Sequence, residues 1–198
     1  MKWLYSALLC LFATSAVATV DGWPALYDVV GVAANDTLNV RASPNANATV
    51  ISILPANAAN VEVIALNDAG TWGLVNVNEQ SGWVSMRYMA RHPNQYAGEF
   101  PAITSCFGTE PFWALAVSGD TLTFSSLDGA DQVEQFSRLR SANRIDRFAV
   151  QAPGVTGMIR EQSCNDGMSD RAFGLSVELL APLYGETALL SGCCTIRP

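Results

Sequence analysis

The 198-residue sequence is poor in charge and nearly lacks two residue types that carry much of protein chemistry. It has one histidine, His92, and one lysine, Lys2, and only 15% of its residues are charged. A Ser-His-Asp or Cys-His catalytic arrangement needs a rigidly held histidine, whereas His92 stands beside Pro93, where a solvated linker side chain is expected. The formal net charge of −7 argues against binding to nucleic acid, which requires basic patches.

Sequence words for cofactors and metals are also missing. There is no glycine-rich phosphate loop, no HExxH and no CxxC, so we expect no cofactor and no metal site. A long apolar period of 3.6 residues is absent, which argues against a helical fold. Short apolar runs broken by Gly, Asn, Asp and Pro are present instead and predict an all-β protein with small strands. These runs are YDVVGV, TLNVR, VISIL, VEVIAL, WGLVNV and GWVSM.

No apolar run is long enough to span a bilayer. Residues 1–18, MKWLYSALLCLFATSAVA, combine one positive charge, a short apolar stretch and a small-x-small end. This pattern predicts a signal peptide cleaved after Ala18, and therefore a periplasmic or secreted protein without a stable membrane span. The mature chain would carry ten arginines against 18 acids, a formal charge of 10 − 18 = −8.

Four cysteines remain after such a cleavage, and all lie in the second half of the chain. An even number of cysteines in an exported protein indicates disulfides rather than metal ligands. A bond between the adjacent Cys193 and Cys194 would strain the backbone, so each should reach back to Cys106 or Cys164. Which of the two each one joins stays open.

A polar, proline-bearing stretch divides the chain. Residues 92–105 are predicted to be a linker between a β unit at 27–91 and a disulfide-bonded β-rich domain at 106–198. The first unit has no cysteine and depends on its hydrophobic core alone.

The stretch TWGLVNV shows how this core is built. Alternate residues of a strand face opposite sides, so Val75 and Val77 share one face and Trp72 and Leu74 share the other. Valines suit the interior of a small barrel, which turns Trp72 outward or to the rim. In the next run, SGWVSMRYM, a single turn ending at Tyr88 would bring that ring near Trp72.

Several words in order resemble a bacterial SH3 domain: LNVRASP, VISILP, VEV, the turn at Gly70-Thr71-Trp72, and SGWVSMRYM. The resemblance covers about Tyr27 to Arg91 and implies a small barrel of five or six strands. One departure is LPANAANVEV, where the family usually has a Lys-Gly turn and a basic residue. In related domains, aromatic residues at these positions form a groove that binds peptide, often from peptidoglycan. Carried over to this chain, the groove residues are Trp72, Tyr88, Trp83, Asn39 and Arg41. Rings that only cover the end of the barrel are the alternative.

In the second half, the words GTEPFW and DGMSDR resemble an uncharacterised bacterial family of exported or membrane-associated proteins. The resemblance covers about Cys106 to Arg197 and implies a localisation and a β-rich fold, but no activity. Glu110, Asp166 and Asp170 are the carboxylates of this region that could serve acid–base chemistry. Each also has a purely structural interpretation: Glu110 stands where a strand begins, Asp166 belongs to a turn, and Asp170 forms an ion pair with its neighbour Arg171.

We therefore expect a non-enzymatic exported protein whose SH3-like domain binds a cell-envelope, peptidoglycan-type peptide. Two alternatives stay open. A small, acidic, disulfide-bonded β protein can inhibit or bind a basic partner such as lysozyme, because opposite charges steer the encounter. A cell-wall hydrolase would need Glu110 and Asp166 in one concave site.

Overall fold

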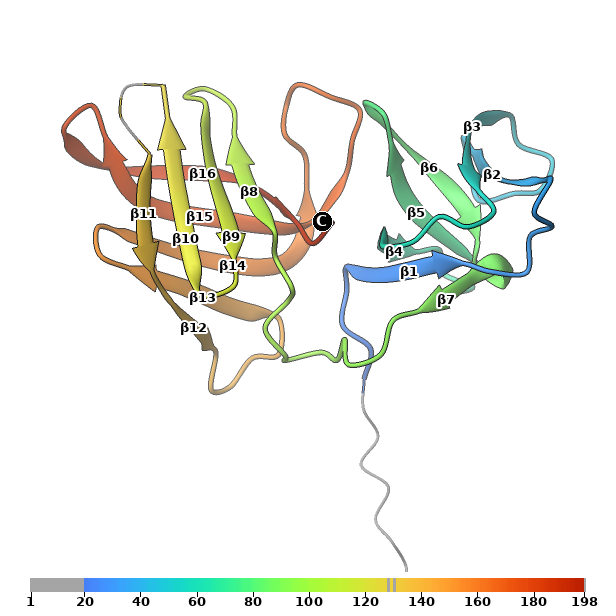
Figure 1. Ribbon diagram of the computed structural model, residues 1–198, viewed down its shortest axis with the longest axis horizontal. Helices are drawn as coiled ribbons and strands as arrows, with labels where there is room; N and C mark the ends of the chain where they lie inside the picture. The colour runs from blue at the N-terminus through green and yellow to red at the C-terminus, as the bar shows by residue number, and fades with distance from the viewer. Residues whose placement is uncertain (1–19, 128, 130, 198) are drawn as a thin grey trace, which may run out of the picture.

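The computed structural model describes residues 20–127, 129 and 131–197, and the predicted signal peptide lies outside this range. Regular structure in the described part consists of β-strands and one 3-10 turn. The strands form two antiparallel sheets, one of seven strands ending at Arg91 and one of nine strands beginning at Ser105 (Figure 1). The predicted fold class is confirmed: an all-β protein with a small SH3-like barrel followed by a disulfide-bonded β-rich part.

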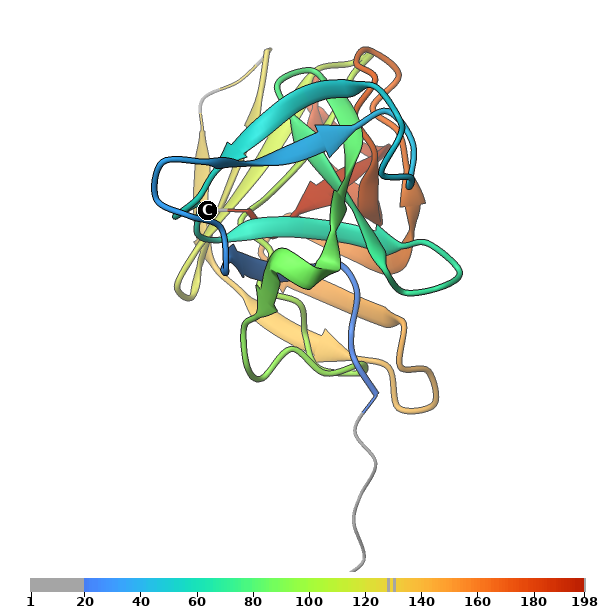
Figure 2. The same ribbon diagram turned by 90° about the vertical axis from the view of Figure 1, so that its right-hand side faces the viewer.

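The first sheet is a small barrel with the strand order β3-β2-β6-β5-β4-β1-β7, and Figure 2 looks onto it. Its elements are β1 (Ala25–Val29), β2 (Thr37–Arg41), β3 (Val50–Pro55), β4 (Val61–Leu66), β5 (Trp72–Val77), β6 (Gln80–Ser85), the 3-10 turn η1 (Met86–Tyr88) and β7 (Met89–Arg91). The expected five or six strands become seven because η1 divides the word SGWVSMRYM. The chain after η1 forms the short β7, which pairs with β1.

Burial alternates along β5 as its sequence predicts. Val75 and Val77 are buried, whereas Trp72 and Leu74 are half-buried. The third inward position is Gly73, where a Cβ atom would come within 2.6 Å of the sulfur of Met86. A side chain at this position would therefore collide with η1, and the glycine lets the turn pack closely against β5.

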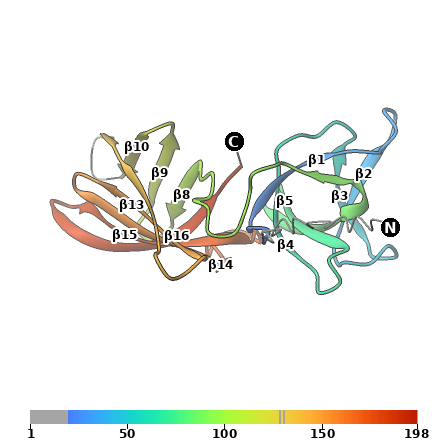
Figure 3. The ribbon, with the colours of Figure 1, turned by 90° about the horizontal axis from the view of Figure 1, so that it is seen from below.

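The second sheet has the order β11-β10-β9-β8-β16-β15-β14-β13-β12. Its strands are β8 (Ser105–Gly108), β9 (Trp113–Ser118), β10 (Thr121–Ser126), β11 (Gln132–Gln135), β12 (Ser137–Arg140), β13 (Arg147–Ala152), β14 (Val155–Cys164), β15 (Phe173–Leu183) and β16 (Glu186–Thr195). The strands β11 and β12 lie at opposite edges of this sheet, yet only Phe136 separates them in sequence. The sheet must therefore curl until its two edges meet, and Figure 3 shows it curved around its interior.

Apolar side chains fill the interior of this second barrel. Leu115, Leu122 and Leu179 are at most 2% exposed, and the rings of Trp113 and Phe124 lie 6.4 Å apart between centroids. A barrel of about eight strands has an interior that side chains can fill completely. This interior is therefore a packed core.

Two disulfides connect the strands of this barrel. Cys106 on β8 bonds to Cys194 on β16, and Cys164 at the end of β14 bonds to Cys193. The prediction that each member of the adjacent pair reaches a different partner is confirmed. The register explains the first bond, because Cys194 and Cys106 stand opposite each other on paired strands.

The predicted linker packs against both barrels. The side chain of Gln95 accepts a hydrogen bond from the backbone N–H of Leu26 at 2.7 Å and donates one to the carbonyl of the same residue at 3.0 Å. Farther along, Phe100 meets Phe148 edge to face with 5.7 Å between ring centroids. The segment thus holds β1 on one side and the second barrel on the other.

A second connection between the barrels is the segment from Asn165 to Ala172, between β14 and β15. Its backbone pairs with the β5–β6 hairpin: Ser81 donates to the carbonyl of Asp170 at 3.0 Å, and Asp170 donates to that of Glu79 at 3.0 Å. Asn76 donates to the carbonyl of Ala172 at 2.8 Å. In Figure 1 this segment is the orange loop beside the tip of the hairpin.

Candidate functional site

A groove with a volume of about 430 Å³ lies at one end of the small barrel, beside η1. In Figure 1, η1 is on the side of the barrel remote from the nine-stranded sheet. The groove is lined by β2 and its preceding loop, the start of β5, and η1. Its lining residues are Gly31, Val32, Ala33, Asp36, Thr37, Leu38, Asn39, Arg41, Ala46, Trp72, Ser85, Arg87 and Tyr88. Four of the five predicted groove residues are among them: Trp72, Tyr88, Asn39 and Arg41.

The indole of Trp72 is positioned by the turn before β5. The carboxamide oxygen of Asn67 accepts hydrogen bonds from the backbone N–H groups of Thr71 and Trp72, each at 2.9 Å. An asparagine at this place fixes the turn by satisfying its donors. Because β5 turns its valines inward, Trp72 faces the groove, half-buried.

The phenol ring of Tyr88 comes to the groove through η1. The backbone N–H of Met86 donates to the carbonyl of Thr71 at 3.0 Å, and that of Val30 donates to the carbonyl of Tyr88 at 2.9 Å. These bonds hold η1 against the start of β5 and the end of β1. The guanidinium carbon of Arg87 lies 5.7 Å from the centroid of the Tyr88 ring, within the range of a cation–π contact.

Arg41 and Asn39 face the groove from β2, two positions apart and therefore on the same side of the strand. The guanidinium of Arg41 donates to the carbonyl of Ala48 at 2.7 Å and so supports the loop between β2 and β3. Asp36 is exposed, and its carboxylate accepts a hydrogen bond from the backbone N–H of Thr37 at 2.8 Å. The charged groups of the groove are thus two arginines, Arg41 and Arg87, and one acid.

Trp83 is not among the groove's lining residues, although it was predicted to be. It stands opposite Arg41 and Leu74 in the strand register and shares their half-buried outer face of the sheet. Strand parity places it on the same face as Trp72, but two pairs of residues farther along the β5–β6 ladder, away from η1. Arg87 and Asp36 were missed by the sequence reading, although Arg87 directly precedes Tyr88.

Residues 36–90 match the bacterial SH3 domain family. The match runs from the residue before β2 into β7, so it includes every predicted groove residue. No curated protein and no solved structure matches the chain. The resemblance of the C-terminal half to an exported or membrane-associated family has no support from these comparisons and stays a prediction.

The carboxylates of the second barrel lie apart from the groove of the SH3 domain. Asp166 has a side chain that is only 4% exposed, and its own loop occupies it. It accepts hydrogen bonds from the backbone N–H groups of Met168 and Ser169 at 3.0 and 2.9 Å. Burial alone would raise the pKa of Asp166, but the hydrogen bonds from Ser169 and Met168 outweigh it and lower this pKa below its ordinary value.

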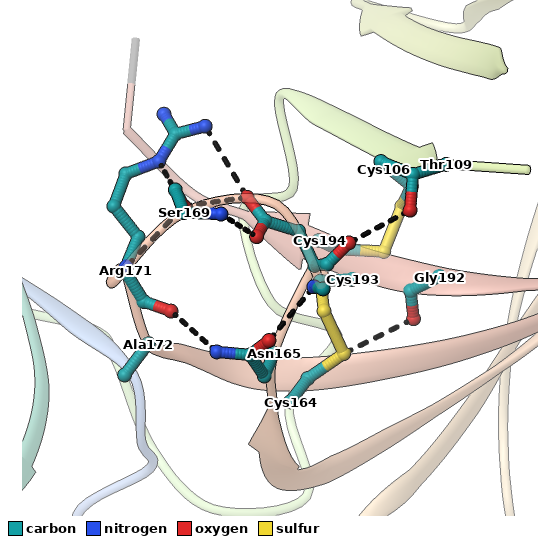
Figure 4. The surroundings of a disulfide bond; sticks show 12 residues. Cys106, Thr109, Cys164, Asn165, Ser169, Arg171, Ala172, Gly192, Cys193 and Cys194 are labelled. Carbon is teal, nitrogen blue, oxygen red and sulfur yellow. Dashed lines mark hydrogen bonds and ion pairs between the residues drawn. A yellow bond between two sulfur atoms is a disulfide. The ribbon is translucent and has the colours of Figure 1, made fainter. Parts of the chain in front are cut away.

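Arg171 pairs with other partners than the predicted Asp170. Its guanidinium lies 3.4 Å from Asp166 and 3.7 Å from Glu79, which belongs to the SH3 domain. Asp170 contributes its backbone to the junction instead. Glu110 is exposed in the turn before β9, next to Thr109, whose hydroxyl donates to the carbonyl of Asp166 at 2.7 Å (Figure 4). The two loops are neighbours, but the carboxylate of Asp166 is turned into its own loop, and neither acid lines the groove.

His92 is not the solvated side chain that its place beside a proline predicts. Its Nε2 atom lies 2.7 Å from the carboxylate of Asp28 on β1. The hydrogen bond from His92, together with one from the backbone of Asn60, lowers the pKa of Asp28 below its ordinary value. The two partners are 64 positions apart in the sequence, which explains why no local pattern could reveal the pair.

Residues suited to a metal do not cluster in the part of the chain that is described: no three His, Cys, Asp or Glu side chains gather there. Within the same residues no helix is long and apolar enough to cross a membrane. The two disulfides and the SH3 domain are consistent with an extracytoplasmic protein.

Proposed function

We propose that this protein is an exported, non-enzymatic binding protein whose SH3 domain holds a peptide of the cell envelope, of the peptidoglycan type. The observation that carries the proposal is the groove in which Trp72, Tyr88 and Arg41 come together. Domains of this family commonly bind cell-wall peptidoglycan. The predicted export and the two disulfides would place the protein in the compartment where such peptides occur.

The chemistry of the groove suits a peptide. The rings of Trp72 and Tyr88 offer flat apolar area at a small entropy cost, with polar edges that orient a ligand. Arg87 and Arg41 add donors that match a peptide carboxylate. Asn39, exposed on β2, supplies an amide for a backbone group of the ligand.

Binding without catalysis is supported by what surrounds the groove. General acid–base hydrolysis needs two positioned titratable groups, and the only acid in the groove lining is Asp36. This carboxylate is exposed and already caps Thr37. The alternative of a hydrolase using Glu110 and Asp166 is disfavoured, because Asp166 is committed to its loop.

The proposal is tested by retention on purified peptidoglycan. Trp72→Ala should reduce the bound fraction by at least about tenfold. A central aromatic side chain typically contributes about 2 kcal/mol to the binding free energy of such an interface. Trp83→Ala is the matched control, since this half-buried tryptophan lies on the same sheet face but outside the groove. We expect it to be retained like the unmodified protein.

Two results would count against the groove. Equal retention of both variants would mean that the rings only cover the end of the barrel. Failure of the unmodified protein to be retained at all would remove peptidoglycan as the ligand. Circular dichroism of each variant shows whether the fold is intact.

A further inference from the structure

A second, larger cavity of about 680 Å³ lies between the two barrels. One wall is formed by β3, the segment from β3 to β4, the start of β4 and the end of β5 in the SH3 domain. The other wall comes from β8, the β14–β15 segment and the end of β16. In Figure 1 the chain between β3 and β4 runs from the far side of the small barrel toward the second one.

The strand that lines this cleft has a free edge. β3 is the outermost strand of its sheet and pairs only with β2 among the described strands. Four consecutive residues, Ser52 to Pro55, line the cleft. Successive side chains of a strand point to opposite faces of the sheet. Four consecutive residues can therefore border the same cavity only if the cavity runs along the edge of the strand. Pro55 has no N–H, and its carbonyl already accepts a hydrogen bond from the backbone N–H of Ala58 at 3.0 Å, so the free edge that faces the cleft is that of Ser52 to Leu54.

The opposite wall carries positive charge. Arg171 and Arg197 line the cleft, and the guanidinium of Arg197 has no ion pair or hydrogen bond among the described residues. Arg171 is held over the ring of Phe173, 5.6 Å from its centroid, and its charge is shared with its two acidic partners. Arg197 is exposed, and apart from the attraction between its charge and that of Glu62 its guanidinium is open to a ligand.

The one acid in the lining, Glu62, is already engaged. It is 6% exposed and accepts hydrogen bonds from the hydroxyl of Thr195 and, at 3.4 Å, from the backbone N–H of Ile196. Burial raises the pKa of Glu62, whereas these hydrogen bonds and the positive charge of Arg197 act against the rise. The cleft therefore favours an anionic ligand although the whole chain is acidic.

Apolar contacts complete the cleft. Ile53 on β3 is 52% exposed at its border. Across from it, Phe107 meets Phe173 edge to face with 5.1 Å between ring centroids. A ligand lying along β3 would pass between this isoleucine and Phe107, where its apolar side chains could be buried.

We propose that this cleft binds an extended acidic peptide, which adds a strand to the free edge of β3 and places a carboxylate at Arg197. Backbone pairing supplies the affinity, alternate apolar side chains meet Ile53 and Phe107, and the guanidinium selects for negative charge. This site is separate from the groove at Trp72 and does not depend on the function proposed for it.

Binding is measured by fluorescence anisotropy with a labelled synthetic peptide of about eight residues in which valine and glutamate alternate. A peptide with lysine in place of each glutamate is the comparison. We expect the acidic peptide to bind and the basic one to bind at least about tenfold more weakly. Hydrogen exchange should show slower exchange of backbone amides in β3 when the acidic peptide is present.

Matched variants locate the site. Arg197→Gln and Ile53→Asp should each weaken binding about tenfold. Arg41→Gln and Val50→Asp should not, because Arg41 lies in the groove and Val50, equally an exposed apolar residue of β3, does not line the cleft. The proposal is overturned if the acidic peptide does not bind, if both peptides bind alike, or if the two sets of variants behave alike. Trp72→Ala should leave this binding unchanged, which separates the result from that on peptidoglycan.

Discussion

Among single residues, Glu161 on β14 has a carboxyl group well suited to a test by pH. It is half-buried at the junction of the barrels. Burial, reinforced by the negative charge of Asp146, raises the pKa of Glu161 from 4.5 to about 7. Between these values the folded protein holds a proton that the unfolded chain has lost. The stability that this proton provides is complete below about pH 4.5 and is lost as the pH rises through about 7.

Once screening by solvent is included, we expect the free energy of unfolding to fall by ~1 kcal/mol between about pH 5.5 and about pH 8. This corresponds to a fall in melting temperature of about 3 °C. Glu161→Gln, which cannot titrate, should lose this part of the pH dependence. Glu186→Gln, at an exposed position on β16, is the control and should retain it. Differential scanning fluorimetry at the two pH values measures the effect. An unchanged slope in Glu161→Gln would contradict the assignment.

At the scale of the element, local patterns predict strands and their faces well. Alternation along TWGLVNV indicates which side of β5 is buried, because strand geometry depends only on neighbouring residues. Four of the five predicted residues line the groove: Trp72 follows from this parity, Tyr88 from the turn after β6, and Asn39 and Arg41 from the resemblance to bacterial SH3 domains. Parity cannot exclude Trp83, because it gives the face of a residue but not its distance from η1 across the sheet.

Contacts between distant segments are what the sequence leaves undetermined. Asn76 and Ala172 are 96 residues apart, and nothing in either surrounding stretch indicates that they meet. The closure of the second barrel at Phe136 is likewise not visible in the local sequence. It can be inferred only from the order of all nine strands, which places β11 and β12 at opposite edges of the sheet. The cleft between the barrels was missed for this reason.

The segment between β14 and β15 is an element whose anchoring can be tested. Its first end is tied by the Cys164–Cys193 disulfide, and its other end pairs with the hairpin of the SH3 domain. Replacing both cysteines by alanine should loosen the segment and speed hydrogen exchange at the amides of Ser81 and Asp170 by about tenfold. The amide of Val40, in the core of the small barrel, serves as internal control. Unchanged exchange at both junction amides would show that the disulfide does not support this contact.

At the scale of the whole molecule, the two barrels are joined by contacts at three places, and each contact comes from a different segment of the chain. The first is Gln95 in the connecting stretch, the second is Asn76 against the β14–β15 segment, and the third is Glu62 against the end of β16. Gly174 adds close packing, because a Cβ there would come within 2.9 Å of Pro24. These contacts hold the groove and the cleft in a fixed relation, so the molecule should tumble as one body.

Removing two of these contacts should separate the motion of the barrels. In the double variant Asn76→Ala with Glu62→Ala, Ala172 loses its hydrogen bonds to the asparagine, and Thr195 and Ile196 lose their acceptor. Each unsatisfied buried group costs about 1–3 kcal/mol, which favours an open junction. Relaxation of ¹⁵N nuclei should give one rotational correlation time for both barrels of the unmodified protein, and a shorter one for the small barrel of the variant. Asn39→Ala, on the exposed side of β2, should tumble like the unmodified protein. If the double variant also tumbles as one body, the connecting stretch alone fixes the barrels, and the cleft would keep its shape without the contacts of Asn76 and Glu62.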